Sequence, residues 1–387
     1  MSNHDKHDQS CTHVCLISDQ PIPNLIPLLI EQPKKAIFLV SPEMTDQAER
    51  LTRVLRPRGV SVDFRKISSA YDFKAVEQAC KDIMQSEGTP DRLVLNVTGG
   101  TKIAALAAFQ YLYFNNHNQR IIYLDTHNNQ LLQLAPENTA TPIDGNLIKV
   151  RDYLIAYGMN PDPMDESRGA ESRSGLSELA QLLIQGESLL SKLNAAIDRQ
   201  SIGKKPSYLN LTLNELGEKA EDLAACFEKC GVATRTQSGD FNIPSKEKIF
   251  FCQGGWLEEY VFRAVKSQVL KGLDLALNVK VQWDGKGRRP TENEFDVLFT
   301  HSNRLHLISC KASNPERITT TGTRAIEALN ELETLSDRVG GLFGRAMLVS
   351  ARRLSDFDRE RGKKMKIEIV DGQDVLHLKE RIARWLR

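Results

Sequence analysis

The sequence predicts an α/β protein in which two sheet-containing units flank a mainly helical segment. Short apolar runs alternate with amphipathic stretches up to about residue 135, which is the pattern of strands joined by crossover helices. From about residue 251 the order changes to helix, three strands, helix and strand. A length of 387 residues also exceeds what one core usually holds, so more than one domain is expected.

The first unit is predicted to hold a doubly wound sheet. Short apolar runs, typical of strands buried on both faces of a parallel sheet, occupy residues 13–18, 36–40 and 92–96. Residues 59–67 alternate as a strand does, and residues 120–125 close the series. Amphipathic helices are predicted between them at residues 22–31, 43–55, 72–85 and 101–115. Asn128 and Asn129 then form a turn into residues 130–134, the hairpin partner of the preceding strand. Strands separated by helices imply crossover connections, hence the doubly wound sheet.

The remaining elements complete three predicted domains. Residues 135–175 are polar and rich in Pro, Asp, Ser and Gly, which indicates a linker with one helix near residues 148–157. Two helices and a small hairpin follow in residues 176–243, an order that a winged-helix module would give. The last unit is predicted as helix 255–269, strands 276–283, 294–300 and 304–310, helix 322–338, strand 345–350 and helix 373–385. The domains are therefore placed at residues 1–145, 146–250 and 251–387.

Composition excludes several classes of protein. The chain is 41% hydrophobic and 26% charged, as soluble globular proteins are, and no apolar run approaches the roughly 18 residues of a membrane helix. A net charge of +1 means that any nucleic-acid surface must be local. The seven cysteines are scattered without a CxxC pair, and the first residues carry no hydrophobic signal. A cytoplasmic location is expected.

A glycine-rich loop stands where ligands bind in open α/β sheets. The run NVTGGTK (residues 96–102) lies between a buried strand and a helix start, where free backbone N–H groups face an anion. Two glycines permit close approach, and Lys102 adds positive charge. A second loop, at Ser18, Asp19 and Gln20, follows the first strand at the same edge. The simpler alternatives are a tight turn capped by Thr101 and, for the second loop, ordinary turn chemistry.

Together these loops resemble the CARF domain, the CRISPR-associated Rossmann-like sensor of cyclic oligoadenylates, over about residues 11–135. The resemblance rests on the early strand and loop, on NVTGGTK, and on the YLDT that ends at Thr126. It implies a Rossmann-like doubly wound fold and a homodimer with cyclic tetra-adenylate across its axis. The implied ligand contacts are Ser18, Asp19, Gln20, Thr98, Gly99, Gly100, Thr101 and Lys102.

Acids and a lysine also converge in the last unit. Glu294 and Asp296 lie two apart on one predicted strand, so both point to one face, and Ser309 and Lys311 do so on the next. A turn at Asn303 pairs the two strands. Carboxylates that hold Mg²⁺ or Mn²⁺, with a lysine beside them, are what phosphodiester hydrolysis requires. The alternative is a solvated face, since acid pairs followed by a lysine are common.

This layout resembles the PD-(D/E)xK nucleases, specifically the restriction-endonuclease-like half of CARF-containing CRISPR ancillary nucleases. The resemblance implies Asp296 as the principal metal ligand, Lys311 as the catalytic lysine and Glu258, or else Glu259, as the helix acid. The carboxylate usual two residues before the lysine is Ser309 here, and a hydroxyl is a poor ligand for a hard divalent ion. Two acids are candidates to replace it: Glu294 on the strand and Glu327 on the following helix.

Two basic runs and a tryptophan are candidates for nucleic-acid contact. They are Lys280, Lys286, Arg288 and Arg289 with Trp283, and Arg352, Arg353, Arg359, Arg361, Lys363 and Lys364. The simpler alternatives are that the basic runs are solvated faces and that Trp283 packs in the core.

The resemblance implies a type III CRISPR ancillary effector that serves antiviral defence. Cyclic tetra-adenylate would bind the homodimeric sensor and activate a metal-dependent endonuclease that cuts DNA, RNA or both, with Mg²⁺ or Mn²⁺ as cofactor. The alternative is a ligand-responsive nucleic-acid-binding regulator whose nuclease fold is degenerate. Ser309 favours the regulator, whereas Asp296 and Lys311 favour the enzyme.

Overall fold

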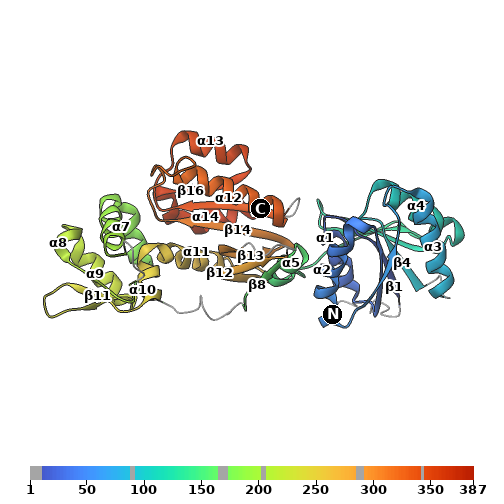
Figure 1. Cartoon of the computed structure of the whole chain (residues 1–387), viewed down its shortest axis with the longest axis horizontal. Coiled ribbons are helices and arrows are strands. Elements are labelled where there is room, and N and C mark those ends of the chain that lie inside the picture. The colour runs from blue at the N-terminus through green and yellow to red at the C-terminus, as the bar shows by residue number, and fades with distance from the viewer. Residues whose placement is uncertain (1–10, 88–91, 164–172, 202–205, 285–291, 341–343) are drawn as a thin grey trace. The chain divides into compact units, whose positions relative to one another are not determined.

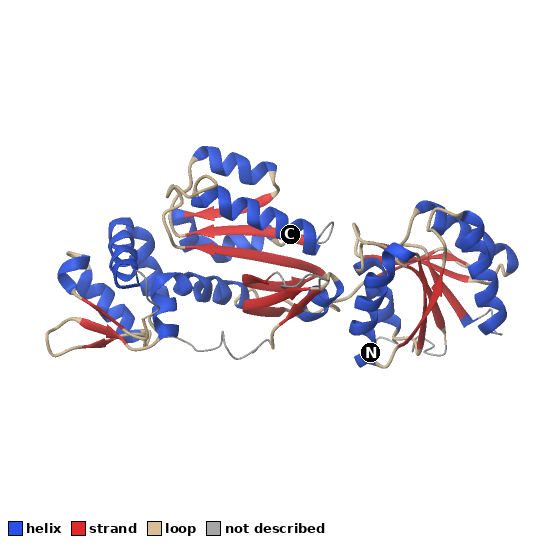
Figure 2. Ribbon diagram, viewed as in Figure 1, coloured by secondary structure: helices blue, strands red, loops and turns tan. Residues whose placement is uncertain are grey.

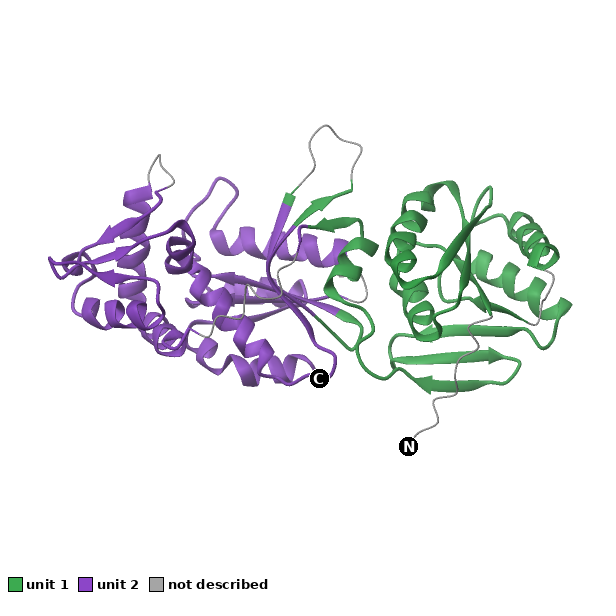
Figure 3. Ribbon diagram, turned by 90° about the horizontal axis from the view of Figure 1, so that it is seen from below, with its two compact units in different colours: residues 1–161, 281–292, 300–304 green, residues 162–280, 293–299, 305–387 purple. Residues whose placement is uncertain are grey.

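The computed structural model describes residues 11–87, 92–163, 173–201, 206–284, 292–340 and 344–387. The chain forms two compact units, which Figure 3 shows in different colours. The first comprises residues 1–161, 281–292 and 300–304, and the second comprises residues 162–280, 293–299 and 305–387. In the described part of the chain no helix is both long and apolar enough to cross a membrane.

The first unit contains a seven-stranded sheet in the order β3-β2-β1-β4-β5-β6-β7. Strands β1 to β5 are parallel, as predicted, and β6 and β7 are antiparallel to their neighbours. The strands are β1 (Thr12–Leu16), β2 (Lys35–Val40), β3 (Ser61–Lys66), β4 (Leu93–Asn96), β5 (Arg120–Asp125), β6 (Gln130–Ala135) and β7 (Thr139–Pro142). The central strands are apolar because both faces of the sheet are covered, and Val14, Ile37 and Leu95 are fully buried.

Helices cover both faces of this sheet. They are α1 (Ile22–Glu31), α2 (Thr45–Leu55), α3 (Phe73–Glu87) and α4 (Lys102–Asn115). Figure 1 shows α1 and α2 on one side of the strands and α3 and α4 on the other. This is the predicted doubly wound arrangement, and it brings the carboxyl ends of β1 and β4, which are neighbours, to one edge.

The predicted linker is partly regular structure. Residues 139–142 form β7, residues 150–156 form α5 (Val150–Ala156), and β8 (Met159–Pro161) pairs with the second sheet through residues 281–283. The linker prediction is therefore wrong before residue 162. The sequence pattern missed β7 because it is an edge strand with all four residues exposed, so it lacks the apolar alternation that marks a buried strand.

A six-stranded sheet carries the C-terminal part of the chain, in the order β16-β15-β14-β13-β12-β8 (Figure 2). Its further strands are β12 (Asp274–Trp283), β13 (Glu292–His301), β14 (Arg304–Lys311), β15 (Gly344–Ser350) and β16 (Ile367–Asp371), and its helices are α11 (Trp256–Lys266), α12 (Arg324–Gly340), α13 (Asp356–Lys364) and α14 (Leu378–Trp385). Strands β14, β15 and β16 are parallel, so their carboxyl ends share one edge. Helix α13 was not predicted, because its residues are almost all charged.

The middle segment has the element order of a winged helix. It runs α6 (Leu176–Gln185), α7 (Glu187–Ser201), β9 (Leu209–Leu211), α8 (Leu213–Leu216), α9 (Ala220–Lys229), β10 (Thr234–Arg235) and β11 (Phe241–Ile243), with strand order β10-β11-β9. Its buried residues Leu183 and Phe227 belong to one hydrophobic cluster with Trp256 and Val297 of the C-terminal part. The segment is thus packed into the second unit.

The outer face of α9 does not suit a nucleic-acid backbone. Glu221, Asp222 and Glu228 are exposed there. Arg235, on the neighbouring strand, forms ion pairs with Glu221 at 2.5 Å and Glu228 at 3.8 Å. Acidic groups repel phosphates, and the paired arginine has its charge compensated already. What the structure shows for this winged-helix-like segment is its packing into the core of the second unit.

The turn between β13 and β14 belongs to the first unit and is held there by Asn146 and Leu147. Ser302 and Asn303 join β13 to β14, with φ values of 50° and 59°. Asn303 accepts a hydrogen bond from Leu147 N at 2.7 Å and donates its own N–H to Asn146 at 3.0 Å. Asn146 also donates to the hydroxyl of Thr300 at 2.7 Å. Asn303 and Thr300 are 1% and 0% exposed, so these bonds satisfy buried polar groups.

Candidate functional site

The β13–β14 hairpin brings Asp296 together with Ser309 and Lys311. Its two-residue turn sets the register so that Asp296 lies opposite Ser309 and Glu294 opposite Lys311. The Oδ2 atom of Asp296 accepts hydrogen bonds from Cys310 N at 2.6 Å and from the Ser309 hydroxyl at 3.2 Å. The Ser309 hydroxyl thus orients Asp296 rather than replacing a carboxylate.

Glu258 projects from the first turn of α11 toward the same acids. Burial raises its pKa to about 8, and the negative charges of Asp296 and Glu294 add to this rise against a hydrogen bond from Asn278 and the charge of Lys311. Its Oε2 atom is buried and has no hydrogen-bond partner among the described residues. Glu259 points elsewhere, because Arg173 holds its carboxylate at 3.0 and 3.1 Å. Glu258 is therefore the helix acid of the candidate site.

Local glycine chemistry positions this helix. Residues 251–255 form a π-helical turn, Phe251–Gly255, directly before α11. A Cβ atom on Gly255 would come within 2.9 Å of the Phe250 ring, so a larger residue there would displace that side chain. On the opposite side, Asn278 interrupts β12 with a φ of 53°, a conformation that asparagine tolerates better than most residues.

A small cleft of about 30 Å³ lies between the hairpin and α12. Its lining includes Glu294, Asp296, Ser309, Lys311 and, from α12, Ala328, Glu331, Leu332 and Leu335. Glu327, the helix acid expected to reach in, is not among these residues. Its carboxylate instead accepts a hydrogen bond from the Thr321 hydroxyl at 2.5 Å. Glu331, one turn further, was missed; its place beside Ala328, Leu332 and Leu335 on the inner face of α12 was the available signal.

These residues fit a hard divalent cation by chemistry. Carboxylate oxygens are the ligands that Mg²⁺ and Mn²⁺ prefer, and an unpartnered buried oxygen at Glu258 among like charges is a place where a cation relieves repulsion. In the conformation described, no three acidic, histidine or cysteine side chains of the described residues stand close enough to hold a metal together. Binding therefore requires the acids to draw inward.

The raised pKa of Glu258 predicts a pH-dependent stability of the metal-free protein. Between its ordinary value of 4.5 and the folded pKa of about 8, the folded chain keeps a proton that the unfolded chain has lost. The contribution of Glu258 to the free energy of unfolding is therefore most favourable below pH 4.5, and it falls as the pH rises from 4.5 to about 8. In a chelating buffer, the thermal midpoint of the wild type is expected to fall more between pH 5 and pH 8 than that of Glu258→Gln. Parallel curves for the two proteins would contradict the assignment.

The predicted ligand loop lies against the end of β1. A Cβ atom on Gly99 would overlap the carbonyl oxygen of Leu16, and one on Gly100, whose φ is 76°, would come within 2.8 Å of the Leu16 side chain. Both positions therefore require glycine. Asn24, fully buried in α1, supports the loop. It donates a hydrogen bond to Leu16 O at 2.8 Å and accepts one from Asn96 at 3.2 Å. Its signal in the sequence is an asparagine inside an otherwise apolar helix.

The two threonines of the loop hold the backbone. Thr98 donates its hydroxyl to Asn96 and accepts from Leu124 N at 2.7 Å, and Thr101 donates to Ala70 O at 2.5 Å while capping α4 through Ala104 N. Lys102 and Asp19 are exposed, whereas Ser18 and Gln20 are half-buried. Gln20 accepts a hydrogen bond from the Tyr157 hydroxyl at 3.1 Å. The Ser18 hydroxyl donates to Gln20 O at 3.3 Å. Lys102 and Asp19 are charged side chains that these loops expose.

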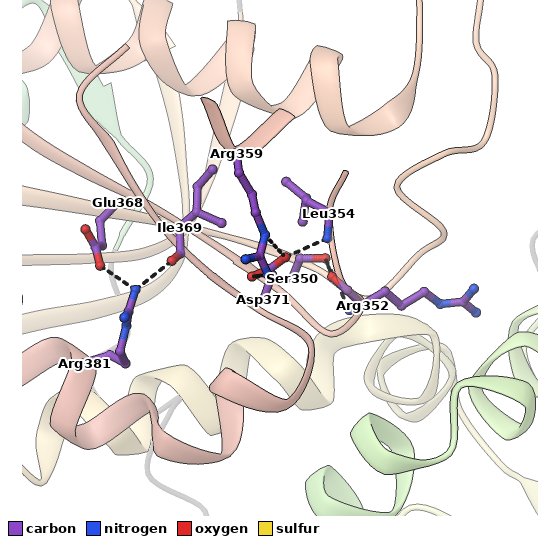
Figure 4. A network of polar contacts seen from close by, with 8 residues as sticks. All are labelled: Ser350, Arg352, Leu354, Arg359, Glu368, Ile369, Asp371 and Arg381. Atoms are coloured by element: carbon purple, nitrogen blue, oxygen red, sulfur yellow. Dashed lines mark hydrogen bonds and ion pairs between the residues drawn. The ribbon is translucent and has the colours of Figure 1, made fainter. Parts of the chain in front are cut away.

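In the two basic runs that were predicted to contact nucleic acid, the described side chains differ in exposure and in their hydrogen-bond partners. Lys286, Arg288 and Arg289 lie outside the described residues, while Lys280 is exposed. In the second run, Arg359 is structural, because it holds the buried Asp371 at 2.6 and 3.1 Å together with Leu354 N (Figure 4). Arg352 points away from that group and donates to Ser191 of α7 at 2.7 Å. Exposed Arg353, Lys363 and Lys364 remain as phosphate contacts to test.

Two family models match the chain, one in each predicted sheet-containing domain. Residues 12–153 match the family described as the Card1 CARF domain, and residues 245–387 match the Card1-like endonuclease domain. No curated protein sequence matches the chain.

Similar solved structures cover nearly the whole chain. Protein VC1899 from Vibrio cholerae is 24% identical with a TM-score of 0.83, and 98% of each chain is covered. Can2 from Sulfobacillus thermosulfidooxidans, solved in complex with cyclic tetra-adenylate, is 25% identical with a TM-score of 0.76 and 99% coverage of each chain. A type III CRISPR defence DNA nuclease activated by cyclic oligoadenylate is 19% identical with a TM-score of 0.54, over 89% of this chain and 46% of that one. The protein thus joins an N-terminal CARF domain of the Card1 family to a C-terminal Card1-like endonuclease domain.

Proposed function

We propose that the protein is a type III CRISPR ancillary effector, an endonuclease of the PD-(D/E)xK kind that cyclic tetra-adenylate activates and a divalent metal supports. The observation that carries the proposal is that Asp296 and Lys311 line one cleft of a Card1-like endonuclease domain, with the buried Glu258 near enough for their charges to shift its pKa. The CARF domain in the same chain, and the complex of Can2 with cyclic tetra-adenylate, support the activator.

Each residue of the nuclease site has a defined task in this proposal. Asp296, Glu258 and Glu294 would hold Mg²⁺ or Mn²⁺, which when bound polarises the scissile phosphate and lowers the pKa of water. Lys311, opposite Glu294, orients the attacking water and stabilises the negative charge that develops on the phosphate. Ser309 and Cys310 N keep the Asp296 carboxylate in one orientation, so that less reorganisation is needed when substrate arrives. DNA or RNA is the substrate.

The sensor site in this proposal is built mainly from backbone. The start of α4 directs free N–H groups toward a phosphate, and Lys102, its first residue, adds a full positive charge. Loop residues Ser18 and Asp19 lie after β1, which neighbours β4 in the sheet, so they face the same ligand space. A cyclic oligoadenylate carries one negative charge per phosphate, which matches this donor set.

A homodimer is part of the proposal, and α4 supports it. Ile103, Leu106 and Phe114 are 40%, 63% and 67% exposed on this helix, although each is apolar. Their spacing puts them along one side of α4, which begins at the ligand loop. A second copy covering this stripe would bury it and would bring two ligand loops together across an axis.

The turn at Asn303 offers a route by which ligand binding reaches the nuclease hairpin. Arg304, the first residue of β14, donates to the carbonyl oxygen of Thr126 at 3.2 Å, one residue after the end of β5. Strand β14 then continues to Ser309 and Lys311. A shift of the segment near Thr126 would therefore move the hairpin that carries the site, given two states of different ligand affinity.

Ligand-dependent cleavage tests the proposed function. Purified protein is mixed with plasmid DNA, single-stranded DNA and RNA in Mn²⁺, with and without cyclic tetra-adenylate. Cleavage that rises at least about tenfold with the ligand supports an activated nuclease. Tight ligand binding without cleavage of any substrate would overturn it and would leave the alternative that Ser309 favours, a ligand-responsive regulator with a degenerate nuclease fold.

A further inference from the structure

Strands β13 and β14 form one wall of the cleft, the strand wall, and α12 forms the other, the helix wall. On the strand wall, Ser309 stands where a third strand acid would face the cleft, but its hydroxyl is neutral and donates to Asp296 at 3.2 Å. On the helix wall, Glu331 is the acidic residue among the cleft-lining residues of α12. The two walls therefore place a carboxylate across the cleft from a serine.

We propose that Glu331 supplies the carboxylate that the hairpin lacks, and that it binds the divalent cation of the proposed nuclease together with Asp296. The inference rests on the proposed function and extends it to a residue outside the hairpin. Helix α12 is anchored beside the cleft by Ala328, Leu332 and Leu335, which are 5%, 4% and 7% exposed. Glu331 lies among them on the helix, so its position is fixed although its own side chain is exposed.

The side chain of Glu331 is available for this role. No hydrogen bond or ion pair to another described residue restrains it, so turning it into the cleft breaks no contact there. Carboxylates from two different elements are a common way to complete the oxygen shell of Mg²⁺ or Mn²⁺. A cation held between α12 and β13 would also offset the repulsion that Glu294 and Asp296 exert on Glu258.

Glu327 provides a matched control on the same helix. It lies one turn before Glu331, and its carboxylate is bonded to Thr321, with hydrogen bonds from Thr321 and Thr319 lowering its pKa. It does not line the cleft. The two glutamates thus differ in position relative to the cleft but share residue type, charge and helix.

Binding of Mn²⁺ to the full-length protein without substrate tests the inference, measured by calorimetry and by electron paramagnetic resonance of free Mn²⁺. Glu331→Gln is expected to weaken Mn²⁺ binding at least about tenfold, whereas Glu327→Gln stays within about twofold of wild type. Circular dichroism and thermal unfolding establish that each variant is folded. Adding Ser309→Glu to Glu331→Gln is expected to restore most of the lost affinity, since it returns a carboxylate to the strand wall.

The outcomes separate this inference from the proposed function. If Glu331→Gln binds Mn²⁺ as wild type does while Asp296→Asn does not, the role of Glu331 is overturned and the proposed nuclease stands. If wild type shows no saturable Mn²⁺ binding, the metal-dependent function falls and this inference falls with it. A loss in Glu327→Gln as large as in Glu331→Gln would also overturn the inference, because the effect would then be one of helix charge.

Discussion

Asp296→Asn is expected to lower the rate of nucleic-acid cleavage by about a thousandfold while the protein stays folded. Asparagine keeps the shape of the side chain and one oxygen that accepts from Cys310 N, so the packing of the hairpin is preserved. It removes the negative charge and one of the two anionic oxygens that a divalent cation needs. Single-turnover cleavage in saturating cyclic tetra-adenylate and Mn²⁺ measures the loss directly.

Two measurements make this prediction specific. Asp337→Asn, an exposed carboxylate near the end of α12, removes the same charge away from the cleft and should leave the rate unchanged. The thermal midpoint of Asp296→Asn should be close to or above that of wild type in metal-free buffer, since one source of repulsion on Glu258 is gone. Undiminished cleavage by Asp296→Asn would refute the assigned site.

Lys102→Glu is expected to weaken binding of cyclic tetra-adenylate by about a hundredfold or more. The change reverses a charge at the first residue of α4, beside the loop N–H groups that are proposed to meet the phosphates. The fold should tolerate it, because Lys102 is exposed and an acid in the first turn of a helix is favourable. Calorimetric titration with the ligand, together with thermal unfolding, separates lost affinity from lost structure.

Lys34→Glu is the matched control for this change. Lys34 is also exposed, and it directly precedes β2, at the edge of the sheet opposite to the glycine loop. The same charge reversal there should alter ligand affinity less than about threefold at moderate ionic strength. Equal losses in both variants would mean that general electrostatics, rather than the α4 loop, determine binding.

The central strands and the β13–β14 hairpin were predictable because their signals are local. Unbroken apolar runs mark strands buried on both faces, and the spacing of Glu294, Asp296, Ser309 and Lys311 with a turn between them sets a hairpin register. The glycine loop was predictable for the same reason, since Gly99 and Gly100 answer to a steric need that only glycine meets.

Features that depend on tertiary packing were not predictable. The choice between Glu258 and Glu259 depends on Arg173, which lies 86 residues away in the sequence and holds Glu259. Glu327 and Glu331 share a face of α12, so the choice of Glu331 depends on which turn of the helix lies beside the cleft and on a local bond from Thr321 to Glu327. The hydrogen bonds of Thr98 with Leu124 N and of Thr101 with Ala70 O also depend on tertiary packing, because these partners come from other elements.

The hydrogen bonds around Asn303 limit where the chain can be divided into separate fragments. A fragment that begins at residue 245 would keep the β13–β14 turn but lose Asn146 and Leu147, leaving the buried Asn303 and Thr300 without partners. It would also lose β8, which covers the edge of β12 through residues 281–283. A chimera that joins this endonuclease domain to a different sensor would need residues 145–161 as well. The match to the endonuclease family begins only at residue 245, so it does not mark the point at which the chain can be divided.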